Sequence, residues 1–229
     1  MIIKFNYILV LLMVLASCQN ETQTTKGEVG NDGSAQQGTD SLDTNQKYLV
    51  FFGNSLTAGY GVEPSEAFSA LIQKKLDSMK KSYIVVNAGL SGETTAGGNS
   101  RIDWILKQQP VDIFVLELGA NDGLRGIAVA ETRKNLGSII GKVKAAYPKA
   151  VIILAGMMVP PNMGSDYSRS FQKVFPEVAQ IQQVGLIPFL LEGVGGIDSL
   201  NLPDGIHPTP KGHVILAENV WVTLEKYIQ

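Results

Sequence analysis

One serine in this sequence has the surroundings of a nucleophile. Ser55 follows a short apolar run, residues 48–52, and lies in a loop, residues 53–61, that contains three glycines. A serine on such a tight turn, at the start of a helix, lies beside backbone N–H groups that have no helical partner and that suit a developing oxyanion. The same position could equally make Ser55 a plain helix N-cap.

A serine nucleophile needs a base, and the chain contains two histidines. His207 precedes Pro208, which disfavours helical geometry, so we expect it in an extended segment before the last helix. Asp204 lies three residues earlier, close enough for a local turn to bring its carboxylate to the imidazole. His213 falls inside the final predicted helix and is interpreted as a surface or packing residue. Ser55, Asp204 and His207 are therefore the candidate catalytic residues.

Two further loops carry small and polar residues after apolar runs. Residues 87–95 include Gly89 and Gly92, at which the backbone can approach a ligand closely. They match neither the dinucleotide-binding nor the Walker spacing of glycines, and alone they could be an ordinary turn. Residues 117–123 place Asn121 after the next strand, where it could offer a side-chain N–H or be a simple turn residue.

The elements that must position these loops alternate between strand and helix from residue 47 onward. Short apolar runs rich in β-formers predict five strands, at residues 48–52, 83–86, 111–116, 151–154 and 186–189. Helical periodicity predicts helices at residues 65–80, 98–108, 131–146, 167–183 and from about 210 to 227, with Thr209 as the cap of the last and Pro210 at its first position. Such alternation predicts an α/β fold, with a parallel five-stranded sheet covered by helices on both faces. In these sheets, sites form at the carboxyl ends of the strands.

The N-terminal residues have the order of an export signal. Lys4 is followed by an apolar stretch, residues 7–16, and then by small residues. Residues 15–18, Leu-Ala-Ser-Cys, also resemble a bacterial lipobox, which implies cleavage before Cys18 and lipidation of its thiol. An ordinary secretory signal followed by a chance cysteine is the alternative. We therefore expect residues 1–17 to be a lipoprotein signal peptide.

The segment that follows is polar. Residues 18–46 contain few apolar side chains, so they cannot bury enough surface to offset their ordering entropy. We interpret them as a flexible tether between a lipidated Cys18 and a domain at residues 47–229. Cys18 is the only cysteine, which excludes an internal disulfide. The expected location is therefore outside the cytoplasm, in the cell envelope, held to a membrane by lipid.

Composition argues against several other functions. The formal charge of -2 and the scattered Lys and Arg residues give no basic surface for nucleic acid. Two histidines, one cysteine and no His-Glu-x-x-His sequence leave too few strong ligands for a metal site. We expect neither a metal nor any other cofactor.

Four blocks, residues 53–61, 86–98, 116–126 and 204–208, together resemble the SGNH hydrolases, also called GDSL-type lipases. They are most similar to the branch that contains bacterial acyl-CoA thioesterase I/lysophospholipase enzymes and arylesterases, and the resemblance covers residues 47–229. It implies a three-layer α/β sandwich of the SGNH/flavodoxin-like kind. The Gly-x-Ser-x-Gly elbow of the α/β-hydrolases is absent, because Thr57 stands where its second glycine would be.

The resemblance also implies the roles of individual residues. Ser55 attacks the carbonyl carbon, His207 carries the proton to the leaving group, and Asp204 orients His207. The backbone N–H groups of Ser55 and Gly92, with the Asn121 side chain, form the oxyanion hole.

Substrate contacts are implied as well. The loops at residues 123–128 and 157–162 border the acyl pocket, which makes substrate-binding residues of the following: Gly123, Leu124, Met158, Val159 and Pro160. The second loop could instead only pack on the edge of the sheet.

Two positions depart from the family pattern. Asn54 stands where the family usually has Asp before the nucleophile, and Glu93 stands where Asp is usual. Since neither position belongs to the catalytic trio, we expect activity to survive. An Asn oxygen can accept backbone N–H groups in a tight turn as an Asp oxygen does.

The function that follows is a serine esterase acting on small carboxylic esters or thioesters, such as aryl esters, acyl-CoA or lysophospholipid. One alternative within the same superfamily is the deacetylation of xylan or another polysaccharide. An alternative of another class is a catalytically inactive surface-binding lipoprotein, although the complete set of catalytic residue types argues against it.

Overall fold

A computed structural model describes residues 46–229, so the predicted signal peptide, Cys18 and the predicted tether up to residue 45 lie outside the described residues. The described chain forms one parallel sheet in the strand order β2-β1-β3-β4-β5. Its strands are β1 (Lys47–Gly53), β2 (Tyr83–Gly89), β3 (Ile113–Glu117), β4 (Val151–Ala155) and β5 (Gly185–Ile187).

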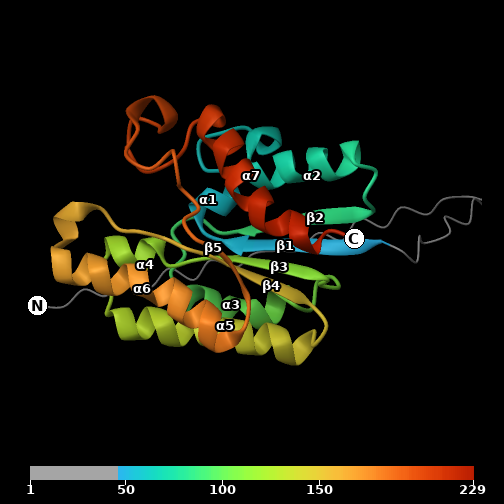
Figure 1. Ribbon diagram of the computed structural model, residues 1–229, viewed down its shortest axis with the longest axis horizontal. Coiled ribbons are helices and arrows are strands. Elements are labelled where there is room, and N and C mark those ends of the chain that lie inside the picture. Colours follow the sequence, from blue (N-terminus) through green and yellow to red (C-terminus); the bar gives the residue numbers. More distant parts are fainter. Residues whose placement is uncertain (1–45) are drawn as a thin grey trace, which may run out of the picture. The chain divides into compact units, whose positions relative to one another are not determined.

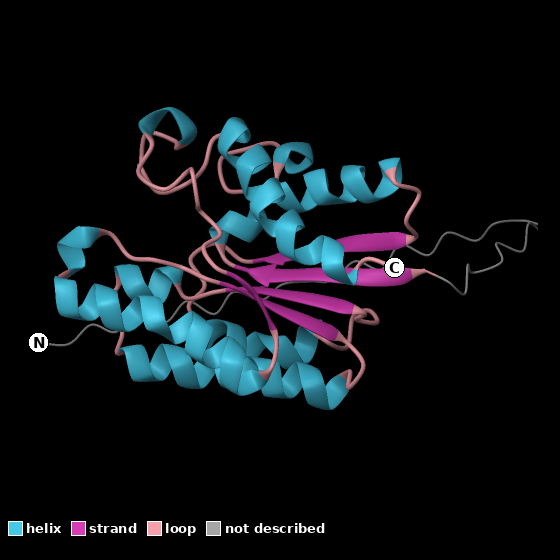
Figure 2. Ribbon diagram, in the orientation of Figure 1, coloured by secondary structure: helices cyan, strands magenta, loops and turns pink. Residues whose placement is uncertain are grey.

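Helices cover both faces of this sheet (Figures 1 and 2). One face carries α2 (Phe68–Ser78) and α7 (Pro210–Leu224), which pack on each other, and the other carries α3 (Thr95–Ile105), α5 (Val129–Ala146) and α6 (Ser165–Gln182). Two short helices, α1 (Ser55–Ala58) and α4 (Ala120–Leu124), follow β1 and β3 directly. The three-layer arrangement predicted from the sequence is therefore present. No helix among residues 46–229 is long and apolar enough to cross a membrane.

The central strand shows why the sheet needs both layers. Residues 49–52 of β1 are fully buried, as expected of a parallel strand covered on both faces. Phe51 packs edge-on against Phe68 of α2, with ring centroids 5.3 Å apart, whereas Phe52 lies on the other face, against Phe114 and α3. Adjacent side chains thus anchor opposite helical layers, just before β1 ends at Gly53 and α1 begins at Ser55.

Several predicted boundaries were shifted by two or three residues, including the starts of α2 and β3, and three differences have a clear local reason. Residues 117–123 were expected to be a loop, but Ala120–Leu124 forms α4. Helix α3 begins at Thr95 instead of residue 98, because Thr94 caps it by accepting a hydrogen bond from the Gly97 N–H at 3.3 Å. Strand β5 ends at Ile187, since Pro188 has no N–H to donate to a sheet.

Helix α7 begins as predicted, with Thr209 as its cap and Pro210 at its first position. Before it, Leu202 donates its backbone N–H to the carbonyl of His207 at 2.7 Å, and Asn201 pairs with Pro208 in an isolated antiparallel bridge. These bonds close residues 201–208 into a compact loop that presents His207.

His213 is a buried packing residue of α7 and is not exposed at the surface. Its Nδ1 accepts a hydrogen bond from the backbone N–H of Phe68 at 3.2 Å, and the two rings stack with centroids 6.2 Å apart. Its Nε2 has no hydrogen-bond partner among residues 46–229. Burial, the largest cause, lowers the pKa of His213 from 6.5 to about 4.

We expect the free energy of unfolding to decrease as pH falls from about 6.5 to about 4, because the unfolded chain then binds a proton at His213 that the folded chain does not. Above that window the residue contributes no pH dependence. His213→Gln keeps an acceptor for the Phe68 N–H but cannot titrate, so it should remove this part of the decrease. Urea denaturation at several pH values across the window measures it. Equal pH dependence in both proteins would show that His213 does not resist protonation.

Candidate active site

Ser55 is the first residue of α1 and lies at the carboxyl end of β1. Asn54 caps this helix, since its side-chain oxygen accepts a hydrogen bond from the Leu56 N–H at 2.9 Å. The tight turn requires glycine at position 53, because a side chain there would collide with the Thr57 hydroxyl and the Glu117 carboxyl. The Ser55 side chain is therefore held at the edge of the sheet, where parallel α/β folds place their sites.

His207 and Asp204 reach Ser55 from the loop before α7. The Nε2 atom of His207 lies 2.9 Å from Ser55 Oγ, and its Nδ1 lies 2.7 Å from Asp204 Oδ2. Since a carboxylate only accepts hydrogen bonds, Nδ1 carries the proton and Nε2 presents its lone pair to the serine hydroxyl. The structure thus brings together the three residues that the sequence nominated, across 152 positions of sequence.

Hydrogen bonds within its own loop orient the Asp204 carboxylate and lower its pKa. Its Oδ1 accepts the backbone N–H groups of Ile206 and His207 at 2.9 and 3.0 Å. The hydrogen bonds from His207, backbone first, lower the pKa of Asp204 from 3.8 to about 2. Asp204 therefore stays ionised opposite the imidazole throughout the neutral and mildly acidic range.

Three N–H donors are available for an oxyanion. Neither the backbone N–H of Ser55 nor that of Gly92 donates a hydrogen bond within residues 46–229. The Asn121 side-chain nitrogen donates one N–H to the carbonyl of Glu93 at 3.0 Å, which leaves its second N–H for another acceptor. Gly92 has a φ of 81°, in the left-handed region that favours glycine.

Polar contacts, those of Asp122 fully buried, fix these donors relative to one another. Asp122, the residue after Asn121, is fully buried and accepts hydrogen bonds from the N–H and the hydroxyl of Thr95 at 2.8 and 2.5 Å. Arg125 donates to the Gly92 carbonyl at 3.0 Å, and Leu90 donates to the carbonyl of Gly53 at 2.9 Å. Helix α4, the glycine loop (residues 87–95) and the nucleophile turn (residues 53–61) are therefore connected.

Glu93, the milder departure from the family pattern, has a structural role. Its nearly buried carboxylate pairs with the guanidinium of Arg101 through two contacts, Nε–Oε1 at 2.8 Å and Nη2–Oε2 at 2.6 Å. Arg101 also donates to the Ala88 carbonyl and lies over the Phe52 ring. The pair holds the glycine loop to α3.

The predicted substrate loops meet at one point. An added Cβ at Gly123 would lie 2.3 Å from Val159, so α4 and the loop after β4 are in contact there. Leu124 and Met158 each expose about two-fifths of their surface, at 38% and 41%, and Pro160 is also exposed. The structure brings the two loops together, and their contact with substrate stays a prediction.

Sequence reasoning missed two residues at this site. Tyr60 places its exposed ring against His207, with centroids 4.5 Å apart. Glu117 is fully buried beneath the nucleophile turn. Glu117 could have been found from the sequence as an acidic residue at the end of a buried apolar strand, since such a residue needs a polar partner. Tyr60 gave no signal beyond its place in the loop of residues 53–61.

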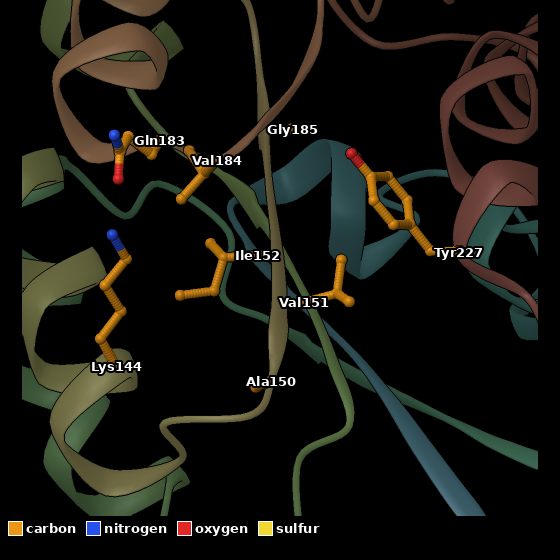
Figure 3. A pocket seen from close by; sticks show the side chains of 8 residues that line it. All are labelled: Lys144, Ala150, Val151, Ile152, Gln183, Val184, Gly185 and Tyr227. Atoms are coloured by element: carbon orange, nitrogen blue, oxygen red, sulfur yellow. The ribbon is translucent and has the colours of Figure 1, made fainter.

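A surface hollow of about 370 Å³ lies elsewhere (Figure 3). It is lined by the first residues of β4 and β5, by Lys144 and Gln183 on one side and by Tyr227 on the other. Because the strands are parallel, this is the end of the sheet opposite to Ser55. The hollow is therefore not part of the candidate active site.

Comparison with known proteins identifies the family to which this chain belongs. Residues 51–215, more than half of the chain, match the model of the GDSL-like lipase/acylhydrolase family. The chain belongs to this family. Within the hydrolase, the match includes both the nucleophile turn and the loop that carries Asp204 and His207.

Named relatives agree. The hydrolase is 42% identical over 177 residues to esterase TesA of Pseudomonas aeruginosa, covering 77% of this chain and 87% of that protein. It is 36% identical over 170 residues to thioesterase 1/protease 1/lysophospholipase L1 of Escherichia coli K12, covering 74% and 79%. Among solved structures, esterase EstA from Pseudoalteromonas sp., inhibited by monoethylphosphonate, aligns with a TM-score of 0.75 and 31% identity over 80% of this chain and 98% of that one. The predicted fold and the predicted class, a serine ester hydrolase, are confirmed.

Proposed function

We propose that the hydrolase cleaves carboxylic esters and thioesters through an acyl-enzyme formed on Ser55. The observation that carries this proposal is the continuous hydrogen-bonded row from Ser55 Oγ to His207 Nε2 and from His207 Nδ1 to Asp204, at 2.9 and 2.7 Å. A hydroxyl within this reach of an oriented imidazole is an activated nucleophile.

In the first half-reaction, Ser55 Oγ bonds to the carbonyl carbon while its proton moves to His207 Nε2. The carbonyl oxygen becomes an oxyanion, which the N–H groups of Ser55, Gly92 and Asn121 stabilise. The tetrahedral carbon then expels its alcohol or thiol, and the imidazolium returns the proton to this leaving group. Asp204, which remains ionised, stabilises the imidazolium without taking its proton.

In the second half-reaction, water replaces the leaving group. His207 accepts a proton from water as the oxygen bonds to the acyl carbon, and the same three donors receive the second oxyanion. Collapse of this intermediate releases a carboxylic acid, and the proton returns to Ser55 Oγ. Each proton that His207 accepts is thus delivered within the same half-reaction.

The acyl group we propose is longer than acetyl. Exposed apolar side chains occur on the loops that carry or neighbour the catalytic residues and on α4: Tyr60, Leu90, Leu124, Met158 and Ile206. Burial of an acyl chain against such side chains stabilises the complex by about 0.8 kcal/mol for each methylene fully removed from water. An acetyl group has no methylene to bury.

A panel of p-nitrophenyl esters from acetyl to decanoyl, with acyl-CoA, lysophospholipid and acetylated xylan, tests this choice. We expect kcat/KM to rise at least about tenfold from acetyl to the best longer chain, which equals about 1.4 kcal/mol. A maximum at acetyl, together with release of acetate from xylan, would instead identify a polysaccharide deacetylase.

We also propose that Cys18, outside the described residues, carries lipid and holds the enzyme on a membrane of the cell envelope. The support is sequence alone: the signal-like order of residues 1–17, the lipobox resemblance and the polar segment that separates Cys18 from the sheet. Cys18→Ser should release the enzyme from the membrane fraction, or leave it unprocessed, with unchanged kcat. An unmodified Cys18 thiol in the mature protein, seen by mass spectrometry, would refute the anchor.

A further inference from the structure

Glu117 is a fully buried carboxyl group that the reaction itself does not use. It is the last residue of β3, and it pairs in register with Gly53 of β1. An added Cβ at Gly53 would lie 2.4 Å from Glu117 Oε2, so only the absence of a side chain there admits the carboxyl group. The group is therefore accommodated directly under the turn that presents Ser55.

Four hydrogen-bond donors converge on this carboxyl group. Its Oε2 accepts the backbone N–H of Asn54 at 3.1 Å, the backbone N–H of Thr57 at 3.2 Å and the Thr57 hydroxyl at 2.7 Å. Its Oε1 accepts an N–H from the Asn54 side chain at 2.7 Å. Four donors on the two residues that flank Ser55 and Leu56 thus converge on one group.

Four donors require an acceptor, so the arrangement fits an ionised carboxylate. Burial raises the pKa of Glu117 from 4.5 to about 7, and the four hydrogen bonds oppose that rise. No ion pair reaches Glu117 within residues 46–229. The charge is therefore compensated by hydrogen bonds from Asn54 and Thr57 alone.

The Asn54 side chain has its orientation fixed at both ends. Its Oδ1 accepts from the Leu56 N–H, and its Nδ2 donates to Glu117. An amide flip would lose both bonds. A carboxylate at position 54 would instead put two acceptor oxygens 2.7 Å apart, which requires a shared proton.

We propose that Glu117 is a positioning residue for Ser55, and that the amide of Asn54 is the donor that matches it. Glu117 holds the first turn of α1 from below, and this keeps Ser55 Oγ within hydrogen-bond reach of His207 Nε2. Asn54 therefore contributes a hydrogen-bond donor that the aspartate usual in the family would lack when ionised. The inference rests on the proposed role of Ser55.

The test exchanges donor and acceptor. In Glu117→Gln, an NH₂ group replaces one of the two carboxylate oxygens. In one orientation this NH₂ group faces Asn54 Nδ2, and in the other it faces the three donors that Oε2 accepts in the wild type. A donor therefore faces a donor in either orientation. Asn54→Asp in the same chain restores complementarity, because the introduced carboxylate accepts from the introduced amide. The substitutions leave the catalytic trio and the oxyanion donors unchanged, and the double variant keeps an oxygen at position 54, where Asn54 Oδ1 lies 3.4 Å from Ser55 Oγ.

We expect Glu117→Gln to lower kcat for an aryl ester by about ten- to a hundredfold, the scale of a displaced reacting group, with KM changed less than about threefold. The double variant should recover kcat to within about fivefold of wild type. Glu131→Gln, on the exposed first turn of α5, is the matched control and should leave kcat unchanged.

Two results would overturn the inference: a kcat within about twofold of wild type in Glu117→Gln, or a double variant as slow as the single one. If Glu117→Gln does not fold, the double variant alone decides, because a folded and active double variant supports the exchange and an unfolded or inactive one contradicts it. Failure here leaves the assignment of Ser55 intact, whereas activity surviving in Ser55→Ala would remove the proposed function first.

Discussion

Replacing Ser55 with alanine is expected to lower kcat/KM for an aryl ester by at least about 10⁴-fold, because loss of a serine nucleophile removes the covalent pathway and leaves only binding and the oxyanion donors. The domain should remain folded. Ser55 is half-buried at the edge of the sheet, and the cap of α1 comes from Asn54. Initial rates with a p-nitrophenyl ester, together with thermal unfolding, measure both effects.

Ser91 provides the control, since it lies exposed on the neighbouring glycine loop. Ser91→Ala should keep kcat/KM within about threefold of wild type. Substantial turnover in Ser55→Ala, or a large loss in Ser91→Ala with an intact fold, would move the nucleophile to the glycine loop.

Asn121→Ala should lower kcat by about 10²–10³-fold and change KM little, because its N–H meets a charge that exists only in the transition state. Asn121→Asp keeps the shape but removes the donor, so it should be at least as slow. Steady-state kinetics on one ester separate kcat from KM. A change confined to KM would mean that Asn121 binds the substrate in its ground state.

Asn121 also has a structural contact. The Asn121 side chain also donates to the Glu93 carbonyl, so its loss could let the glycine loop shift. The loop has independent anchors in the Glu93–Arg101 pair and in the bond from Arg125 to Gly92. The expected loss therefore comes from the missing donor, and a thermal midpoint close to that of wild type would support this reading.

The sheet was predictable because its signals are local. Each strand is a short apolar run, and a strand buried on both faces needs no more information than that run. The loop of Asp204 and His207 was equally predictable from local sequence. Asp204 lies three residues before His207, and Pro208 favours an extended histidine, so the carboxylate was expected beside the imidazole. The oxyanion donors were predicted from the order of the four blocks that resemble the family.

What the sequence concealed depends on contacts between distant segments. The amide of Asn54 was treated as an acceptor, which the bond from Leu56 confirms, but its bond to Glu117 spans 63 positions and has no local signal. Helix α4 was taken for a loop because its Asn-Asp-Gly sequence is typical of turns. The bonds from Thr95 to the buried Asp122 hold it as a helix.

The central claim is that Ser55 is the residue made nucleophilic by His207. Treatment of the full chain with a fluorophosphonate, followed by intact-mass and peptide mass spectrometry, tests it most directly, because this reagent bonds to an activated serine. The account predicts one phosphonyl group on each molecule, attached to Ser55, together with complete loss of esterase activity and no labelling of Ser55→Ala or of the His207→Ala variant on the same timescale. A label on another serine, or esterase turnover that persists in the fully labelled protein, would contradict it.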